Sequence, residues 1–181
     1  MRDTVANPLT EITMRFLLAL FFSLASTVVL PLPANALDVA EGEVVLTVSG
    51  GIAATNNGET AQFDMAMLQA LPETSFATST LWTEGVKTFT GVALAEVLSE
   101  LGVTEGTIRA SAINDYTIEI PVDSVTAGAP IIAYALDGEP MSRRQKGPLW
   151  VVYPYDSDAE YRSEVIYSRS IWQLDRLEIV Q

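Results

Sequence analysis

Three basic residues that lie close together form the first candidate site. Arg143, Arg144 and Lys146 fall within four positions of a chain with ten Lys and Arg residues, 23 Asp and Glu residues and a formal net charge of −13. Arginine offers a carboxylate or phosphate two parallel hydrogen bonds, and the following Gly147-Pro148 lets a ligand approach the backbone closely. The cluster predicts an anion-binding site. The alternative is a solvated loop whose cations pair with surface acids at little net gain in free energy.

Aromatic residues form the second candidate site. Trp82, Tyr153 and Tyr155 combine a flat apolar ring with one polar group, which suits the walls of a pocket for a planar ligand. Tyr153 and Tyr155 follow an apolar run, at the end of an expected strand. The alternative is an ordinary hydrophobic core, which is the favoured interpretation for Trp150 inside that run.

An acidic segment, residues 155–160, forms a third candidate. Its alternating carboxylates are oxygen ligands of the kind that calcium prefers. The run lacks the glycine and the full length of an EF-hand loop, so a solvated loop is the favoured interpretation.

The composition excludes several classes of chemistry. The chain of 181 residues has no cysteine and no histidine, so it has no disulfide, no thiolate nucleophile, no Ser-His-Asp triad and no zinc-finger site. A general acid or base would have to be a carboxylate, a lysine or a tyrosine. The strong acidity argues against a nucleic-acid partner, because phosphate backbones are bound by basic surfaces.

The first 36 residues have the pattern of a secretory signal peptide. Arg15 precedes an apolar run that carries no charge from Phe16 to Leu37, and Ala34-Asn35-Ala36 provides a cleavage site of small residues. We therefore expect a signal peptide over residues 1–36, one domain over residues 37–181, a periplasmic or secreted location and no stable membrane insertion after cleavage. The alternative is a membrane anchor, since the run is nearly long enough to span a bilayer. Met14 provides an alternative start of the chain.

The elements that must position these residues are mostly strands. Alternating or β-branched runs predict strands over 44–48, 76–82, 108–113, 116–120, 131–136, 149–153 and 172–180. Turns are expected at Asn56-Asn57-Gly58, Asn114-Asp115 and Asp137-Gly138. The sequence therefore predicts one α+β domain with most of its strands in the second half.

Two short helices are expected between these strands. The first spans 63–71, with Asp64 as its N-cap and Pro72 as its end. The second spans 91–101, where apolar residues recur at helical spacing; Thr90 is its expected cap and Gly102 its expected left-handed end.

Several local patterns, in this order, resemble the molybdopterin-binding domain of the sulfite-oxidase type. The patterns cover about residues 44–180 and are Leu46-Thr47-Val48-Ser49-Gly50, Leu68–Pro72, Thr90–Leu98, Asn114-Asp115-Tyr116 with Ile120-Pro121, Ile132-Ala133-Tyr134, Asp137-Gly138-Glu139-Pro140, Gly147-Pro148-Leu149, Val151–Pro154 and Trp172–Ile179. The resemblance implies the fold of that family, a single mixed domain that is mostly β with a few short helices. It also implies that the hairpin containing Asp115 approaches the site, and that the region of Arg143–Lys146 lies near the pterin.

The chain differs from this family in the residue that binds the metal. The family supplies a cysteine thiolate to molybdenum from the stretch that corresponds to Phe76–Thr88, and this stretch contains no cysteine. A soft thiolate suits that metal, whereas Thr80, Thr83 and Glu84 offer only hydroxyl or carboxylate oxygens. The resemblance therefore implies the fold and the place of a pocket without implying redox activity, and no catalytic or metal-binding residue is expected.

The sequence thus favours a non-catalytic binding protein with no resident cofactor. The expected ligand is a small anionic or aromatic molecule bound by Arg143, Arg144, Lys146, Trp82, Tyr153, Tyr155 and Asp115. A membrane sensor or redox protein is an expected partner, with the chain in an accessory or sensory role. The alternatives are an oxidoreductase subunit that binds molybdopterin without a cysteine ligand, and a purely structural interaction domain.

Overall fold

The computed structural model describes residues 37–181, and the predicted signal peptide lies outside these residues. Within residues 37–181, no helix is long and apolar enough to cross a membrane.

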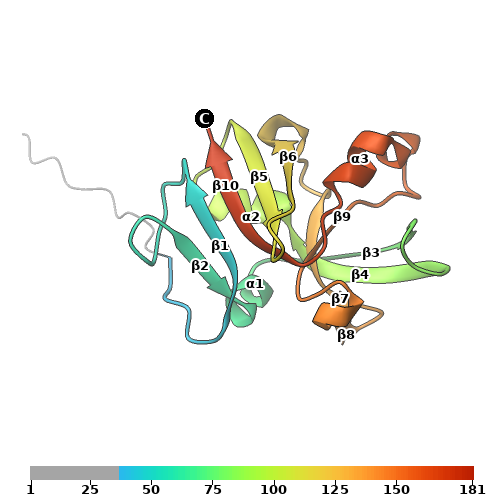
Figure 1. Ribbon diagram of the computed structural model, residues 1–181, viewed down its shortest axis with the longest axis horizontal. Helices are drawn as coiled ribbons and strands as arrows, with labels where there is room; N and C mark the ends of the chain where they lie inside the picture. The colour runs from blue at the N-terminus through green and yellow to red at the C-terminus, as the bar shows by residue number, and fades with distance from the viewer. Residues whose placement is uncertain (1–36) are drawn as a thin grey trace, which may run out of the picture. The chain divides into compact units, whose positions relative to one another are not determined.

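The first sheet has five strands in the order β2-β1-β10-β5-β6. β10 pairs in parallel with β1 and antiparallel with β5, and Figure 1 shows it between these two strands. The strands are β1 (Val44–Gly50), β2 (Ala61–Asp64), β5 (Thr107–Ala112), β6 (Thr117–Pro121) and β10 (Leu174–Val180). The first and last strands of the domain therefore lie side by side at the centre of this sheet.

The second sheet is built on β7, which pairs antiparallel with three strands. Its members are β3 (Glu73–Ser79), β4 (Val86–Ala93), β7 (Ile131–Leu136), β8 (Glu139–Pro140) and β9 (Trp150–Val152). β3 and β4 form a long hairpin that extends away from the first sheet in Figure 1. β9 also contacts the chain that enters β10, where the Val151 N–H donates to the Ile171 carbonyl and the Leu174 N–H donates to the Leu149 carbonyl. The two sheets therefore meet at β9 and the start of β10.

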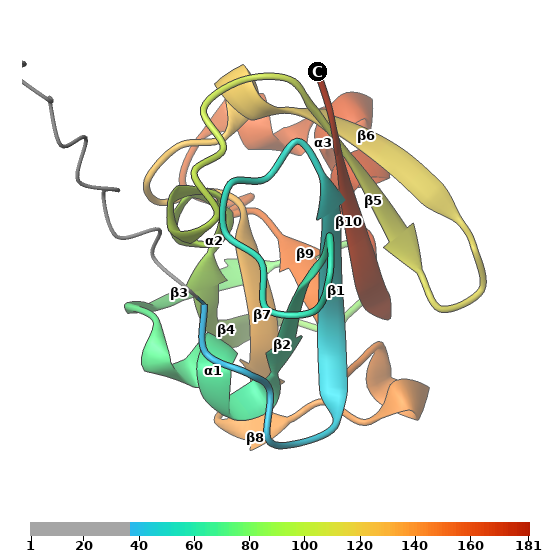
Figure 2. The same ribbon diagram turned by 90° about the vertical axis from the view of Figure 1, so that its left-hand side faces the viewer.

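The helices are short and lie outside the sheets. They are α1 (Met65–Ala70), α2 (Leu94–Glu100) and α3 (Glu164–Arg169), with 3-10 turns η1 (Val122–Ser124), η2 (Arg143–Gln145) and η3 (Ala159–Arg162). Figures 1 and 2 show α2 on one face of the first sheet, and its apolar residues Leu94, Val97 and Leu98 are buried.

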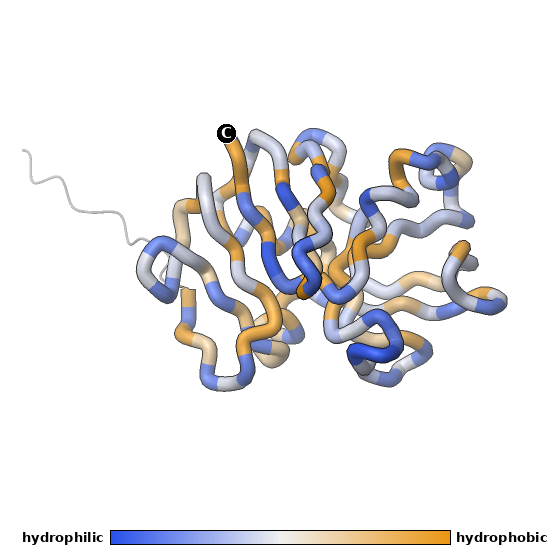
Figure 3. The backbone as a smooth tube through the Cα atoms, viewed as in Figure 1, coloured by the Kyte–Doolittle hydropathy of each residue, from blue (hydrophilic) through white to orange (hydrophobic). Residues whose placement is uncertain are grey.

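Alternation along the strands decides which side chains enter the core. Along β10, Leu174, Leu177 and Ile179 are buried while Glu178 and Val180 are exposed, and the colours alternate along this strand in Figure 3. β7 begins with four buried residues, in the part of the strand that pairs with β4 along one edge and with β9 along the other. The predicted fold class, a mixed domain that is mostly β with a few short helices, is confirmed.

The carboxylate of Asp64 links the N-terminal part of the domain to α1 by hydrogen bonds. Its Oδ1 accepts from the Met67 N–H at 2.9 Å, and its Oδ2 accepts from the Glu41 N–H at 3.0 Å and the Gly42 N–H at 2.8 Å. The predicted N-cap is therefore confirmed, and the same carboxylate also holds a segment more than twenty residues away. These backbone donors, first that of Met67 and next that of Gly42, lower the pKa of Asp64 below its ordinary value.

We expect Asp64→Ala to lower the melting temperature at pH 7 by roughly 5 °C, because α1 loses its cap and two further N–H groups lose their acceptor. A carboxyl whose pKa is lowered in the folded state stabilises the protein above its unfolded-state pKa, and this stability is lost as the pH falls through the folded-state pKa. The difference between wild type and variant should therefore shrink in acid. Thermal unfolding at several pH values measures this, and a difference that stays constant down to the acid limb would contradict it.

The second helix begins later than the sequence predicts. Residues 91–93 continue β4, and α2 starts at Leu94 with Ala93 as an N-cap that makes no side-chain hydrogen bond. Thr90 is therefore not the cap; it lies in β4, where its hydroxyl is 3.0 Å from that of Ser75. The physical reason is strand pairing with β7, and the Leu94 N–H donates to the Pro130 carbonyl in place of a side-chain cap. Gly102 has the predicted left-handed backbone, with φ of 69°.

Two strand predictions are also corrected: β3 begins and ends three residues earlier than predicted, and β10 begins two residues later. β3 ends at Ser79, because the Thr80 hydroxyl accepts from the Trp82 N–H and turns the chain into a loop. β10 begins at Leu174, because Gln173 has a φ of 53°, which a strand does not accommodate. The predicted turns at Asp115 and at Asp137-Gly138 are confirmed by positive φ angles at these residues.

Candidate functional site

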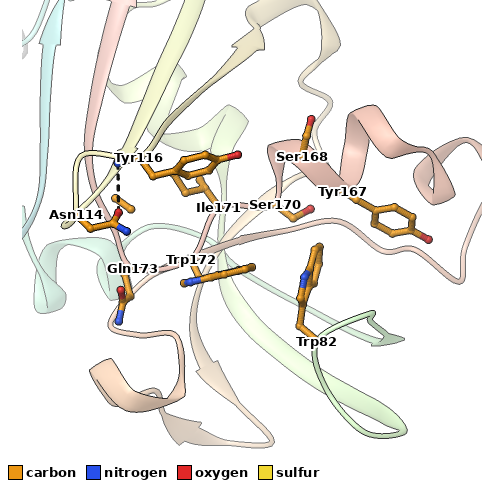
Figure 4. Close-up of a pocket in the computed structure, with 10 residues that line it drawn as sticks. Trp82, Asn114, Tyr116, Tyr167, Ser168, Ser170, Ile171, Trp172 and Gln173 are labelled. Atoms are coloured by element: carbon orange, nitrogen blue, oxygen red, sulfur yellow. Dashed lines mark hydrogen bonds between the residues drawn. The ribbon is translucent and has the colours of Figure 1, made fainter.

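A pocket of about 290 Å³ lies where the two sheets meet, and Figure 4 shows it in close-up. Four segments build it: the β3–β4 loop, the β5–β6 hairpin, the end of α3 and the residues that lead into β10. The lining residues are Trp82, Ala112, Asn114, Tyr116, Tyr167, Ser168, Ser170, Ile171, Trp172 and Gln173. Aromatic rings form much of the wall, and none of the lining side chains is acidic although the chain carries a net charge of −13.

Trp82 is the central ring of an aromatic cluster. Its centroid lies 5.7 Å from Trp172, 5.9 Å from Trp150, 6.0 Å from Tyr167 and 6.2 Å from Tyr155, all in edge-to-face geometry. Edge-to-face pairs at such separations stabilise beyond the area that they bury. The Trp82 indole is therefore held from several sides while part of it still faces the pocket.

Ser170 fixes the inner wall of the pocket. Its hydroxyl accepts from the Tyr155 O–H at 2.6 Å and donates to the Ile166 carbonyl at 2.8 Å, and its own carbonyl accepts from the Trp150 indole N–H at 3.2 Å. Burial raises the pKa of Tyr155 to about 12, so its hydroxyl stays protonated and remains a donor. This network holds the back of the pocket in one arrangement.

Lys146 lies beside the pocket rather than in a solvated loop. Its Nζ is 5.8 Å from the centroid of Trp172, which lines the pocket, and 5.6 Å from that of Trp150. Its backbone is left-handed, with φ of 74°, and its carbonyl accepts from the N–H of Gln173, another lining residue. Of the three predicted basic residues, Lys146 is the one that contacts a pocket wall directly.

The other two basic residues of the predicted anion site point elsewhere. Arg143 and Arg144 are exposed in η2, and Arg143 lies 3.8 Å from the carboxylate of Glu43. The backbone carbonyl of Arg143 accepts from the Gln173 side chain at 2.7 Å, so this residue supports the pocket through its main chain. Since neither guanidinium lines the pocket, the structure does not bring the cluster together there.

The remaining predicted site residues surround the pocket without lining it. Asp115 is at the turn of the β5–β6 hairpin, between Asn114 and Tyr116 of the wall, and its carboxylate is 2.6 Å from Arg176. Tyr153 and Tyr155 are each only 2% exposed and belong to the core behind Trp82. Burial raises the pKa of Tyr153 well above its ordinary value, so its hydroxyl also stays protonated.

Carboxylates of the acidic segment, residues 155–160, accept hydrogen bonds from neighbouring parts of the protein. Asp156 accepts from the Ser79 N–H at 2.6 Å and the Ser79 hydroxyl at 2.8 Å, and Asp158 caps η3 by accepting from the Glu160 N–H. Within residues 37–181, no group of three or more acidic side chains is placed to hold a metal ion. These contacts support the loop interpretation of this segment over a calcium site.

Sequence reasoning missed most of the pocket wall. Trp172 and Tyr116 were expected only as strand residues, yet they are exposed by 39% and 56% and face the pocket. For Tyr116 the available signal was its position directly after the predicted Asn114-Asp115 turn, whereas the sequence carried no comparable signal for Trp172.

The donor atoms of the β3–β4 loop do not fit molybdenum. The family resemblance places the metal-binding thiolate in this stretch, and the chain has no cysteine anywhere. The hydroxyls of Thr80 and Thr83 lie 2.8 Å apart and bond to each other, and Glu84 is exposed. Trp82, which lies between these residues, packs into the aromatic cluster. The loop therefore offers this metal no thiolate, and its two threonine hydroxyls already bond to each other, so the residues present do not fit the metal.

Comparison with known proteins agrees with this architecture. The family model for the oxidoreductase molybdopterin binding domain matches residues 46–157. Among solved structures, the sulfane dehydrogenase SoxCD from Paracoccus pantotrophus is similar, with a TM-score of 0.57 and 18% sequence identity over 80% of this chain and 40% of that one. No curated protein matches.

These matches show the fold and the family. The identity to the sulfane dehydrogenase is too low to carry more than the fold, and the chain covers less than half of that protein's length. The family match spans more than half of the chain and includes the β3–β4 hairpin that carries Trp82. The predicted resemblance is thus confirmed, and the chain belongs to the oxidoreductase molybdopterin binding domain family.

Proposed function

We propose that the chain is a non-catalytic, ligand-binding member of this family, which takes a small planar aromatic molecule into the pocket between Trp82 and Trp172. The observation that carries the proposal is the composition of the wall, in which aromatic rings and neutral polar groups stand where the family resemblance places a metal thiolate. Aromatic faces with a few convergent polar groups are typical of sites for flat ligands.

The size and polar groups of the pocket support a ligand of one or two rings. A volume of about 290 Å³ is at the lower end for small-molecule sites, and a cavity of about 150 Å³ already accepts benzene. Asn114 and Gln173 place amide groups at the wall, and the Gln173 amide nitrogen is already bonded to Arg143. The Asn114 side-chain oxygen accepts from the Tyr116 N–H, so the Asn114 amide nitrogen and the Gln173 amide oxygen are the groups left to orient a ring that carries hydrogen-bonding groups.

We further propose that the protein acts outside the cytoplasm, as an accessory or sensory partner of a membrane sensor or a redox protein. The apolar run after Arg15 and the Ala34-Asn35-Ala36 site support export. A module that only senses a ligand needs a defined pocket and no catalytic chemistry. The β3–β4 loop agrees with this role, because it offers no thiolate to a metal.

The proposal predicts that 2-naphthamide, a neutral planar probe, binds to the pocket. Trp82→Ala should weaken this binding at least about tenfold, because the variant loses one aromatic wall and the ordering of the other rings around it. Isothermal titration calorimetry of the two proteins measures the effect. Leu81→Ala is the matched control, since Leu81 neighbours Trp82 but is 68% exposed and does not line the pocket.

Two results would overturn the proposal. One is the absence of binding for 2-naphthamide and for pterin with the folded wild-type protein. The other is stoichiometric molybdenum in protein exported by its native host, measured by elemental analysis, which would favour an oxidoreductase subunit that holds the cofactor without cysteine.

A further inference from the structure

Lys146 is a cation placed against the aromatic pocket. Its Nζ lies over the rings of both Trp150 and Trp172, within the range of a cation–π contact. The left-handed backbone at Lys146 and the hydrogen bond from the Gln173 N–H to its carbonyl fix the point from which the side chain departs. The ammonium is therefore held beside a pocket wall by both its main chain and its side chain.

The charge of Lys146 is not cancelled by a nearby acid. Among the ion pairs of residues 37–181, none includes Lys146. Arg176 and Arg143 differ in this respect, because Arg176 lies 2.6 Å from Asp115 and Arg143 lies 3.8 Å from Glu43. The wall has no acidic side chain either, so the ammonium of Lys146 lies beside a neutral pocket wall on an acidic protein.

We propose that Lys146 makes the pocket selective for planar aromatic carboxylates over neutral molecules of the same shape. This inference rests on the proposed function, because it requires that planar aromatic molecules enter the pocket. An aromatic acid that stacks against Trp172 places its negative charge near the ammonium on the same ring. The half-buried position of Lys146 limits the screening of this attraction by solvent.

The test compares 2-naphthoate with 2-naphthamide, which have nearly the same shape and differ in charge, by calorimetric titration of the full chain. The wild-type protein should bind the carboxylate roughly three- to tenfold more tightly than the amide. Lys146→Met keeps the apolar stem and should remove this preference while leaving the affinity for the amide within about twofold. Lys146→Arg should retain the preference, which should weaken as the salt concentration is raised.

Lys87→Met is the matched control, because it causes the same change in net charge at a lysine that pairs with Asp137 and does not line the pocket. This variant should keep the wild-type preference. Equal binding of carboxylate and amide by the wild-type protein would overturn the role of Lys146 while leaving the aromatic pocket intact. An unchanged preference in folded Lys146→Met, or its loss in Lys87→Met, would overturn it as well. Failure of both probes and of pterin to bind would instead show that the proposed function itself is wrong.

Discussion

Replacing Trp150 with alanine is expected to destabilise the protein by about 3–5 kcal/mol, a large share of the 5–15 kcal/mol that is typical of folded domains. Trp150 is fully buried in β9, with its ring 5.3 Å from Phe89 and 5.9 Å from Trp82. Its indole N–H also donates to the Ser170 carbonyl. Truncation would thus remove a large apolar side chain, leave a cavity between the sheets and orphan a buried acceptor.

Thermal or denaturant unfolding measures this loss, which corresponds to a fall of roughly 10–20 °C in melting temperature. Trp150→Phe is the informative control, because it keeps an aromatic ring but cannot donate to Ser170, and it should cost much less. Trp172→Ala is a second control, since that ring is 39% exposed and leaves a smaller cavity. A Trp150→Ala variant as stable as Trp172→Ala would contradict the central place of Trp150 in the core.

Gly91→Ala is expected to destabilise the protein by a similar amount, because the new methyl group would clash with main-chain atoms. A Cβ at this position would collide with the Ile132 carbonyl oxygen and would lie 2.6 Å from the Ala133 Cα, both main-chain atoms of the neighbouring strand β7. The register between β4 and β7 also shifts between Thr90 and Gly91, so this irregularity in the pairing lies at the residue that has no side chain. Main-chain atoms cannot rotate away from a clash as a side chain can. We therefore expect the free energy of unfolding to fall by about 3 kcal/mol or more.

Gly128→Ala provides the matched control for Gly91→Ala. No atom lies within 4 Å of a Cβ added at Gly128, and its φ is outside the left-handed region. This substitution should change the free energy of unfolding by less than about 1 kcal/mol. Equal stability of the two variants in denaturant titrations would show that β4 and β7 separate at little cost.

Local patterns predicted the fold well because they depend on near neighbours in the chain. The strand over 131–136, the Asp64 cap and the left-handed Gly102 follow from periodicity, side-chain chemistry and backbone preference. The prediction failed where tertiary contacts compete with local preference. Residues 91–93 have a helical pattern with those that follow, but pairing with β7 stabilises them as strand.

The candidate site was predicted less completely than the fold. Trp82 and Lys146 are at or beside the pocket as the sequence analysis expected, whereas Tyr153 and Tyr155 are buried behind it. Sequence alone does not distinguish a ring that faces a pocket from a ring that fills the core, because both need the same apolar surface. The difference lies in which other segments cover the ring.

The sequence by itself determined the family, the mostly β class of the domain and the lack of any thiolate for a metal. These follow from residue types and from order along the chain, and they need no knowledge of distant contacts. Only the tertiary structure decided which rings form the pocket, because residues 82, 112–116 and 167–173 meet through the pairing of remote strands. It also separated Lys146 from its basic neighbours, since the left-handed backbone at this residue directs one side chain to the aromatic wall while Arg143 and Arg144 remain in solvent.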